Sequence, residues 1–291
     1  MLRSILAATD LSMRSERAIR RAARLAGSMH AGLTMLHVVD DDQPAAVVEV
    51  ESRDAQRMLA DEADALRETL GTEPVVTVRA GHPAETIAHE AAAGAYDLVV
   101  MGAHRRRILA DVFVGTTIER VIRTSRRPVL MANGPAPAAY RSVVVALDFS
   151  SHSDRALDVA AALGLLAAPR LTLVHACAPH AKGMMLHVAG SEDAIQDHVL
   201  RTSVEAAAAI RSRRDALALP PTTLVDAQTP EGDPGRVVAA CVAQAEADLL
   251  VIGTRGAGGL SRILLGSVAE TLLRTLEIDV LAVPALAAYA S

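Results

Sequence analysis

ILAATDLS at residues 5–12 returns as VVVALDFS at residues 143–150, and this repeated stretch decides the fold. Each copy is an apolar run that ends in an aspartate, Asp10 or Asp148. Such a run predicts a buried strand whose chain turns at the aspartate. The copies lie 138 residues apart (143 − 5), so the chain of 291 residues repeats a unit of the common domain size.

The repeat continues toward the end of each copy at a larger offset. Seven residues recur 151 positions later: Gly81, Pro83, Asp97, Gly102, Gly115, Glu119 and Arg123 match Gly232, Pro234, Asp248, Gly253, Gly266, Glu270 and Arg274. The difference (151 − 138 = 13) predicts an insertion in the second copy, which we place in residues 177–193. We expect its Met184, Met185 and Leu186 to pack against the other domain, the alternatives being a mobile flap or a partner-binding surface.

Ten short apolar runs alternate with stretches of helical period. The runs are Ser4–Ala8, Leu33–Val39, Val75–Arg79, Leu98–Met101 and Val129–Met131, then Ser142–Leu147, Leu171–Ala176, Leu224–Ala227, Leu249–Ile252 and Val280–Val283. This alternation predicts an α/β fold, with a five-stranded parallel sheet of order 3-2-1-4-5 in each copy and helices on both faces. We expect domains at 1–132 and 140–286, joined by a Gly/Pro/Ala-rich linker at 133–139.

Composition limits the partners of the chain. Hydrophobic residues make up 51% and aromatic residues only 2%, so the core must consist of Ala, Val, Leu and Ile. The net charge of −5, with 29 basic against 34 acidic residues, gives no broad basic surface for nucleic acid. Two cysteines are too few for a disulfide framework, and no apolar stretch of about 18 residues predicts a membrane span. We therefore expect a cytoplasmic protein without a membrane partner.

Glycines follow the fourth predicted strand of the second copy, in GTRGAGGLSRILLGS at residues 253–267. The spacing G-x2-G-x9-G-S places Gly253, Gly256, Gly266 and Ser267 at its fixed positions. Glycines after a buried strand permit positive φ and let backbone N–H groups approach an anion. Ser267 opens a helix, continued by Val268, whose first amides favour negative charge. The stretch therefore predicts a phosphate-binding loop.

The same stretch has a purely structural interpretation. The glycines could make a flexible loop, and Ser267 with Glu270 fits the pattern of a helix capping box. The first copy has the same framework, carried by Gly102, Gly115, Thr116 and Glu119. The framework is thus shared by both copies, whatever its role.

Asp10 and Asp148 could serve only as turn residues or helix N-caps ahead of Ser12 and Ser151. In a doubly wound sheet, however, the first and fourth strands are neighbours at the switch point, where ligands bind outside the carboxyl ends. Asp148 and the loop from Gly253 would then flank one crevice. There the carboxylate would accept hydrogen bonds from ribose hydroxyls while the glycines hold phosphates.

At these residues the chain resembles the universal stress protein family, in its tandem-domain, ATP-binding branch. The resemblance rests on the family signature G-x2-G-x9-G-[ST] at residues 253–267, on Asp148, on Gly-x-Pro at 232–234 and on the closing strand VLAVP at 280–284. It covers essentially the whole chain. It implies two tandem Rossmann-like domains of the adenine nucleotide alpha hydrolase type.

The resemblance also implies the contacts of the nucleotide, which would be ATP with or without Mg²⁺. Adenine would lie against the backbone near residues 175–177, Asp148 near base and ribose, and the phosphates on the signature residues. The expected binding residues are therefore Asp148, His175, Ala176, Gly253, Arg255, Gly256, Gly266, Ser267 and Val268, with Ser267 as a hydroxyl ligand of the metal. The domains are implied to pair through their final strands within one chain, and a homodimer is a further option.

The first copy departs from the signature at one position. Arg105, within HRRR at residues 104–107, replaces the second glycine. Its side chain would occlude the phosphates or bind them through its guanidinium, unless the arginines are only a solvated charged run. We expect the second site, formed by Asp10, Gly102, Arg105, Gly115 and Thr116, to bind ATP weakly or not at all.

Several enzyme classes lack their motifs here: the sequence has no P-loop, no nucleophile elbow, no HExxH and no CxxC. The leading hypothesis is an ATP-binding stress-response protein that acts as a nucleotide-dependent sensor or regulator, with no catalytic residue assigned. One alternative is a slow ATP hydrolase or autophosphorylating enzyme, in which Arg255 and Arg262 stabilise charge at the γ-phosphate. Another is an interaction module that has lost its nucleotide.

Overall fold

The computed structural model describes residues 2–71, 73–94, 96–102, 116–134, 139–177, 192–255 and 265–284. Their strands form one ten-stranded sheet of order β3-β2-β1-β4-β5-β10-β9-β6-β7-β8. The first half contributes β1 (Ser4–Thr9), β2 (Gly32–Val39), β3 (Val75–Ala80), β4 (Leu98–Gly102) and β5 (Val129–Ala132). The second contributes β6 (Ser142–Ala146), β7 (Arg170–Val174), β8 (Leu224–Gln228), β9 (Leu249–Gly253) and β10 (Asp279–Val283). Each half is parallel and has the predicted order 3-2-1-4-5.

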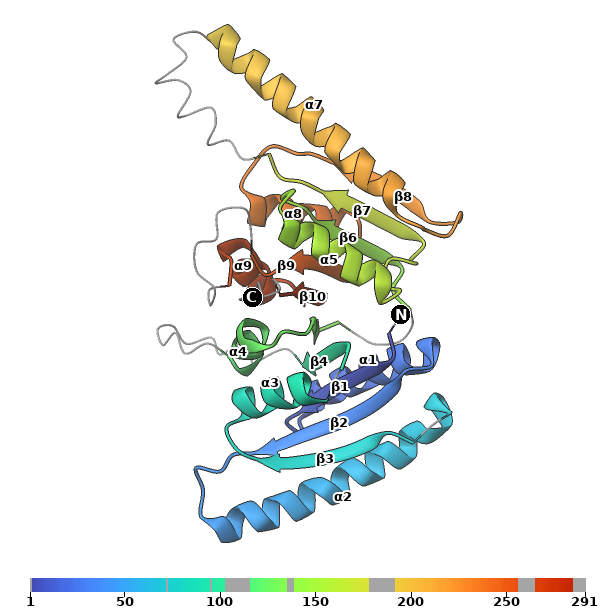
Figure 1. Cartoon of the computed structure of the whole chain (residues 1–291), viewed down its shortest axis with the longest axis vertical. Coiled ribbons are helices and arrows are strands. Elements are labelled where there is room, and N and C mark those ends of the chain that lie inside the picture. Colours follow the sequence, from blue (N-terminus) through green and yellow to red (C-terminus); the bar gives the residue numbers. More distant parts are fainter. Residues whose placement is uncertain are drawn as a thin grey trace, which may run out of the picture.

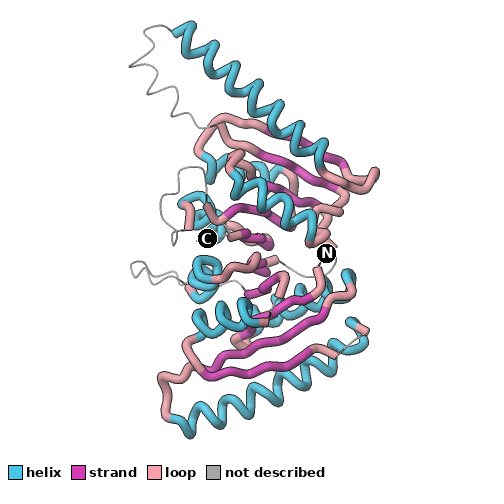
Figure 2. The backbone as a smooth tube through the Cα atoms, in the orientation of Figure 1, coloured by secondary structure: helices cyan, strands magenta, loops and turns pink. Residues whose placement is uncertain are grey.

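Helices cover both faces of the sheet (Figures 1 and 2). One face packs against α1 (Met13–Met29), α2 (Ala45–Leu70), α5 (Ser151–Ala162) and α7 (Glu192–Ala216), and the other against α3 (Pro83–Ala93), α4 (Thr117–Thr124), α8 (Pro234–Gln244) and α9 (Ser267–Thr275). Each helix presents an apolar stripe to the sheet: in α1, Ala18, Ile19, Ala22 and Ala26 are buried at helical spacing. No helix in the described part of the chain has both the length and the apolarity to cross a bilayer.

All ten predicted strands are present, and the differences lie at their ends. Strand β10 begins at Asp279, one residue before the predicted start at Val280. The predictions that carried strands through Leu147 and Ala176 were wrong, because these strands end at Ala146 and Val174. The pairing of β6 with β7 ends at Ala146 and Val174, and Leu147 still donates its N–H to the carbonyl of Val174 at 2.8 Å.

The repeat extends into the long helices. Ala55 and Leu59 of α2 are buried, and so are their counterparts 151 positions later, Ala206 and Ile210 of α7. The larger offset therefore already holds within α7, so the extra residues of the second copy precede this part of the helix. Residues 178–191, with the predicted packing of Met184, Met185 and Leu186, lie outside the described residues.

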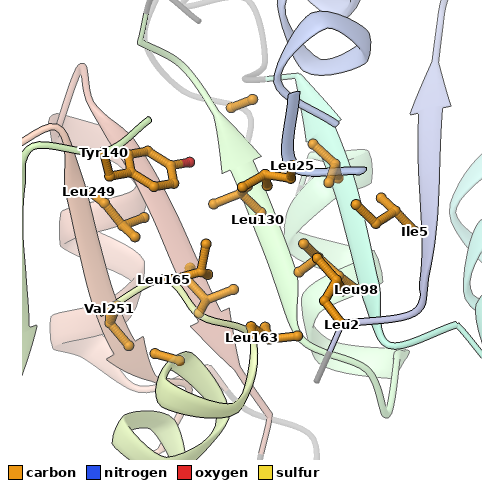
Figure 3. Close-up of a cluster of buried hydrophobic side chains, with 14 of the residues drawn as sticks. Leu2, Ile5, Leu25, Leu98, Leu130, Tyr140, Leu163, Leu165, Leu249 and Val251 are labelled. Carbon is orange, nitrogen blue, oxygen red and sulfur yellow. The ribbon is translucent and has the colours of Figure 1, made fainter. Parts of the chain in front are cut away.

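The two halves meet at the antiparallel pair of β5 and β10, where Leu130 lies opposite Leu281. Side chains from both halves form one hydrophobic cluster beside this pair. Figure 3 shows Leu98 and Leu130 of the first half in the cluster with Leu165 and Leu249 of the second. The halves therefore share a core.

A buried ionic group, the Asp279 cluster, lies at this junction. Asp279 is fully buried, and its Oδ2 lies 2.7 Å from Nε of Arg21 in α1. The same oxygen accepts a hydrogen bond from the Tyr140 hydroxyl at 2.7 Å, while Oδ1 accepts from the backbone N–H groups of Asn133 (2.9 Å) and Gly134 (2.8 Å). Burial raises the pKa of Asp279, an effect that Arg21 and these donors oppose only in part. The cluster thus ties α1 and the segment between the halves to β10.

Tyr140 gives a test of this burial. Burial raises the pKa of Tyr140 well above its ordinary value, and the charge of Asp279 raises it further although Arg21 lowers it. An unfolded tyrosine ionises near pH ~10, so the raised folded pKa stabilises the fold below that pH, and this contribution is lost as pH rises further. We expect the phenolate absorbance of wild type and Tyr140→Phe to coincide until alkaline unfolding begins. A phenolate step near pH ~10 that Tyr140→Phe removes would contradict the burial.

Candidate functional site

The turn after β6 holds the first predicted site residue, Asp148. Its Oδ1 accepts hydrogen bonds from the backbone N–H of Ser150 at 3.0 Å and from the Ser150 hydroxyl at 2.5 Å. Ser150, and not Asp148, is the N-cap of α5, because its side chain accepts from the N–H of Ser153. The backbone of the turn therefore fixes the Asp148 carboxylate at the carboxyl end of the strand.

Gly253 lies beside this turn. Strands β6 and β9 are neighbours, with Val145 opposite Val251. A Cβ atom at Gly253 would lie 3.2 Å from the backbone oxygen of His152 in the first turn of α5. The close approach of helix and strand end thus favours glycine here, because a Cβ atom would make a tight contact with the backbone of α5. The Asp148 turn and Gly253 share the edge where the predicted switch point lies.

Gly266 returns to the same edge. Its N–H donates to the carbonyl of Thr254 at 2.9 Å, and the N–H of Thr254 donates to the carbonyl of Val283 at 3.0 Å. These two bonds fix the start of α9 next to the end of β9. The segment between them includes Gly256, which lies outside the described residues, whereas Arg255 is described and is partly exposed.

The predicted capping box of Ser267 and Glu270 was wrong. Gly266 is the N-cap of α9, so Ser267 is already the first helical residue and its side chain is exposed. Glycine has no side chain to accept from the first amides of the helix, which include those of Ser267 and Val268. A helix start of this kind leaves its positive end open to an anion.

The end of β7 supplies a backbone edge. His175 donates its backbone N–H to Gln228 and Cys177 donates to Pro230, so both residues bond toward β8. Along a strand these directions alternate, so Ala176 turns its N–H and C=O toward the side from which β6 has departed. The His175 ring lies in the same place, because its Nδ1 is 2.9 Å from the carbonyl of Leu147. A carbonyl only accepts, so this nitrogen carries the proton.

Comparison with known proteins decides the family. The model of the universal stress protein family matches residues 1–133 and 139–284. This chain belongs to the universal stress protein family. It is similar to a universal stress protein of Thermus aquaticus, from the QAH/OAS sulfhydrylase 3′ region, with 28% identity over 144 residues that cover 50% of this chain and 98% of the relative.

Two crystal structures have the same fold over nearly the whole chain. A universal stress protein from Archaeoglobus fulgidus DSM 4304 is 22% identical, with a TM-score of 0.67 and coverage of 97% of this chain and 98% of that one. A protein of unknown function from Pseudomonas aeruginosa PAO1 is 21% identical, with a TM-score of 0.66 and coverage of 97% and 92%. This universal stress protein therefore consists of two repeated domains.

The N-terminal copy of this universal stress protein repeats the turn. Asp10 Oδ1 accepts from the N–H of Ser12 at 3.0 Å, and a Cβ at Gly102 would lie 3.1 Å from the backbone oxygen of Arg14 in α1. Partial burial raises the pKa of Asp10, but hydrogen bonds from Ser12 and Ser15 outweigh it and lower the pKa overall. Asp10 is therefore ionised at neutral pH.

The helix start of the N-terminal copy differs from that of the C-terminal copy. Thr116 is the N-cap of α4 and accepts from the N–H of Glu119 at 3.3 Å, whereas its counterpart Ser267 makes no such cap. One of the first amides of α4 is thus already satisfied. Arg105 and Gly115 lie outside the described residues.

Sequence reasoning missed a set of charges that joins the first turn of each of the helices α4 and α9 to the last turn of the other. Helices α4 and α9 lie side by side (Figure 1), and Arg274 Nε donates to Glu119 Oε1 across them at 2.9 Å. The counterpart pair, Arg123 and Glu270, is 3.9 Å apart. The signal was present in the repeated Glu-x3-Arg spacing. Its meaning depends on the contact between the halves, which the spacing does not reveal.

Sequence reasoning also missed Phe149 and Arg213. The ring of Phe149 stacks on that of His175, with centroids 4.1 Å apart, and Arg213 of α7 lies over the Phe149 ring at 4.8 Å. Phe149 is one of two phenylalanines in the chain, and Arg213 replaces Glu62 of the first copy under the 151-residue offset. The change of charge from Glu62 to Arg213 at equivalent positions of the two copies could have indicated this contact.

Proposed function

We propose that the C-terminal domain binds ATP and that the protein is a nucleotide-dependent sensor or regulator. The observation that carries the proposal is the convergence of Asp148, the Gly253 strand end and the glycine-capped start of α9 at neighbouring strands. Each of the three would contact a different part of an adenine nucleotide. Asp148 would accept from ribose hydroxyls, and backbone free of side chains would approach the phosphates.

The remaining expected residues fit the same ligand. We propose that adenine lies against the backbone edge at Ala176, with His175 beside it. Ser267 is exposed and does not cap its helix, so its hydroxyl would be a ligand of the Mg²⁺ that ATP carries, together with phosphate oxygens and water. Arg255, Gly256 and Val268 would complete the contacts to the phosphates.

The N-terminal site, with Asp10, Gly102, Arg105, Gly115 and Thr116, would bind ATP weakly or not at all. Thr116 already satisfies an amide of α4, and Arg105 replaces a signature glycine. We propose that the domains, at 1–132 and 140–286, act as an intramolecular pair through β5 and β10, and that a homodimer would form through other surfaces. Both cysteines are free, which fits a cytoplasmic location.

A regulator of this kind requires that ATP bind two conformations of the paired domains with different affinity. The charges between α4 and α9 offer a route, because they connect the helix at the ATP site with the other domain. A slow hydrolase or autophosphorylating enzyme is the second candidate. Arg255, two residues after the strand end, would then stabilise charge on the γ-phosphate.

One experiment separates these functions. The nucleotide released on denaturing freshly purified protein is identified, ATP binding is titrated by calorimetry, and ADP formation is followed over hours. We expect one ATP site per chain and retention of intact ATP. Steady ADP formation would favour the enzyme, two equivalent sites would refute the weakness of the N-terminal site, and absence of any ATP binding would refute the proposal.

A further inference from the structure

Three side chains from distant parts of the chain form a stack beside the proposed ATP site. His175 and Phe149 have ring centroids 4.1 Å apart and planes inclined by 22°. The guanidinium carbon of Arg213 lies 4.8 Å from the centroid of Phe149, within the range of a cation–π contact. We call this arrangement the His175–Phe149–Arg213 stack.

Arg213 is itself held in a fixed orientation. Its Nε and Nη2 donate to Asp154 of α5 at 2.5 and 2.8 Å, and its Nη1 donates to the carbonyl of Ala209 at 3.2 Å. A guanidinium bonded along one edge to both oxygens of a carboxylate, and through its third nitrogen to a backbone carbonyl, has little freedom to rotate. Arg213 is thus a fixed support for the Phe149 ring.

The stack includes Phe149, which is the residue next to Asp148, the proposed contact of the ribose. Phe149 has φ of 60°, a left-handed conformation that is costly for a bulky residue. It lies between Asp148 and Ser150, whose hydrogen bonds define the direction of the Asp148 carboxylate. Contacts that hold the ring of Phe149 therefore also hold the turn that aims this carboxylate.

The N-terminal copy has the turn without the stack. Leu11 occupies the position of Phe149, also with φ of 60°. Glu62 takes the place of Arg213 and faces Glu16, the counterpart of Asp154, across the same two helices. Burial raises the pKa of Glu62 and the nearby charge of Glu16 raises it further, although Arg20 lowers it in part. An attractive pair in one copy is thus a repulsive pair in the other, and the attractive pair occurs in the copy with the complete glycine signature.

We propose that Arg213 is a positioning residue for the nucleotide. Through Phe149 it holds the Asp148 turn in the orientation in which the carboxylate accepts from the ribose hydroxyls. Through Arg213, helix α7 thereby contributes to the preference of the site for a ribonucleotide. The inference rests on the proposed function, since it specifies how one of its contacts is made.

Calorimetric titration of the full chain with ATP and with 2′,3′-dideoxy-ATP tests the proposal. Wild type should bind ATP about tenfold more tightly than the dideoxy analogue, as expected for loss of a hydrogen bond to a carboxylate. Arg213→Met should lose this discrimination while its affinity for the analogue stays within twofold of wild type. Arg214→Met is the matched control, because Arg214 is the next residue of α7 and pairs with Asp215; it should leave both affinities unchanged.

Phe149→Leu introduces the residue that the first copy has at this φ. It should reduce discrimination as Arg213→Met does, and the double variant should lose no more than either single one, because both act through the same stack. Equal loss of both ligands in Arg213→Met, or full retention of discrimination, would overturn the inference, as would a wild type that binds both ligands equally well. A wild type that binds neither ligand would instead refute the proposed function and the inference with it.

Discussion

Replacing Arg21 by methionine should lower the free energy of unfolding by about 3–5 kcal/mol, the usual cost of leaving a buried charge without its partner. Arg21 is 4% exposed and Asp279 is fully buried, with 2.7 Å between Nε and Oδ2. Tyr140, Asn133 and Gly134 would still donate to the carboxylate, but they carry no charge. For a chain of this size the loss corresponds to a decrease in Tm of roughly 10 °C, measurable by thermal and denaturant unfolding.

Two comparisons make this expectation specific. Arg20→Met removes an exposed pair with Glu16 on the same helix and should change stability by less than about 1 kcal/mol. Arg21 lowers the pKa of Asp279, so in Arg21→Met the carboxyl becomes neutral at higher pH and the deficit should shrink as pH falls. A double variant, Arg21→Met with Asp279→Leu, should recover part of the stability. Equal stability of Arg21→Met and Arg20→Met would contradict the role of the cluster.

Gly256→Arg should weaken ATP binding by at least about a hundredfold, since two lost backbone hydrogen bonds to phosphate amount to about 3 kcal/mol. The change copies Arg105 of the N-terminal copy into the signature position. Gly253 and Gly266, on either side of this position, are fixed at the strand end by the approach of α5 and by the bond to Thr254. On the proposed function, arginine at this position would replace a glycine of the phosphate-binding signature by a bulky side chain.

The control for this variant has the same added charge in the same loop. Gly258→Arg lies outside the four positions of the signature, so it should retain ATP affinity within a few-fold of wild type. Calorimetry measures both variants, and thermal unfolding of each shows whether the fold persists. Similar losses in the two variants would show that the loop tolerates no bulk anywhere and would remove the special role of Gly256.

The fold was predictable because its signals are local. Most strands are apolar runs, although β3 and β8 contain polar residues, and the offsets of 138 and 151 carry each prediction from one copy to the other. The errors arose where a distant partner decides the outcome. The last strand was predicted to begin at Val280, yet Asp279 is buried in β10 because Arg21 and Tyr140, more than 130 residues away, neutralise and solvate it.

The site was predictable in part for the same reason. The spacing of glycines and the strand-end aspartates predict one edge of the sheet, and in the structure Asp148, Gly253 and Gly266 lie at the ends of the neighbouring strands β6 and β9. That a nucleotide binds at this edge stays a prediction. A shift of one residue in the start of α9 changed the role of Ser267, because capping depends on which residue leaves the helix first. The contact of Arg213 with Phe149 depends on the packing of α7 against α5, which no periodic pattern specifies.

The antiparallel pairing of β5 and β10 within one chain makes the contact between the two domains independent of protein concentration. Two separate copies would find each other only at sufficient protein concentration, whereas covalent fusion makes the encounter unimolecular, at an effective concentration on the order of millimolar. Every chain then contains one pair of non-identical domains, even at a low protein concentration. A mutation in one domain therefore changes the same side of every pair, whereas separate copies would form a mixture of pairs of identical and of different domains.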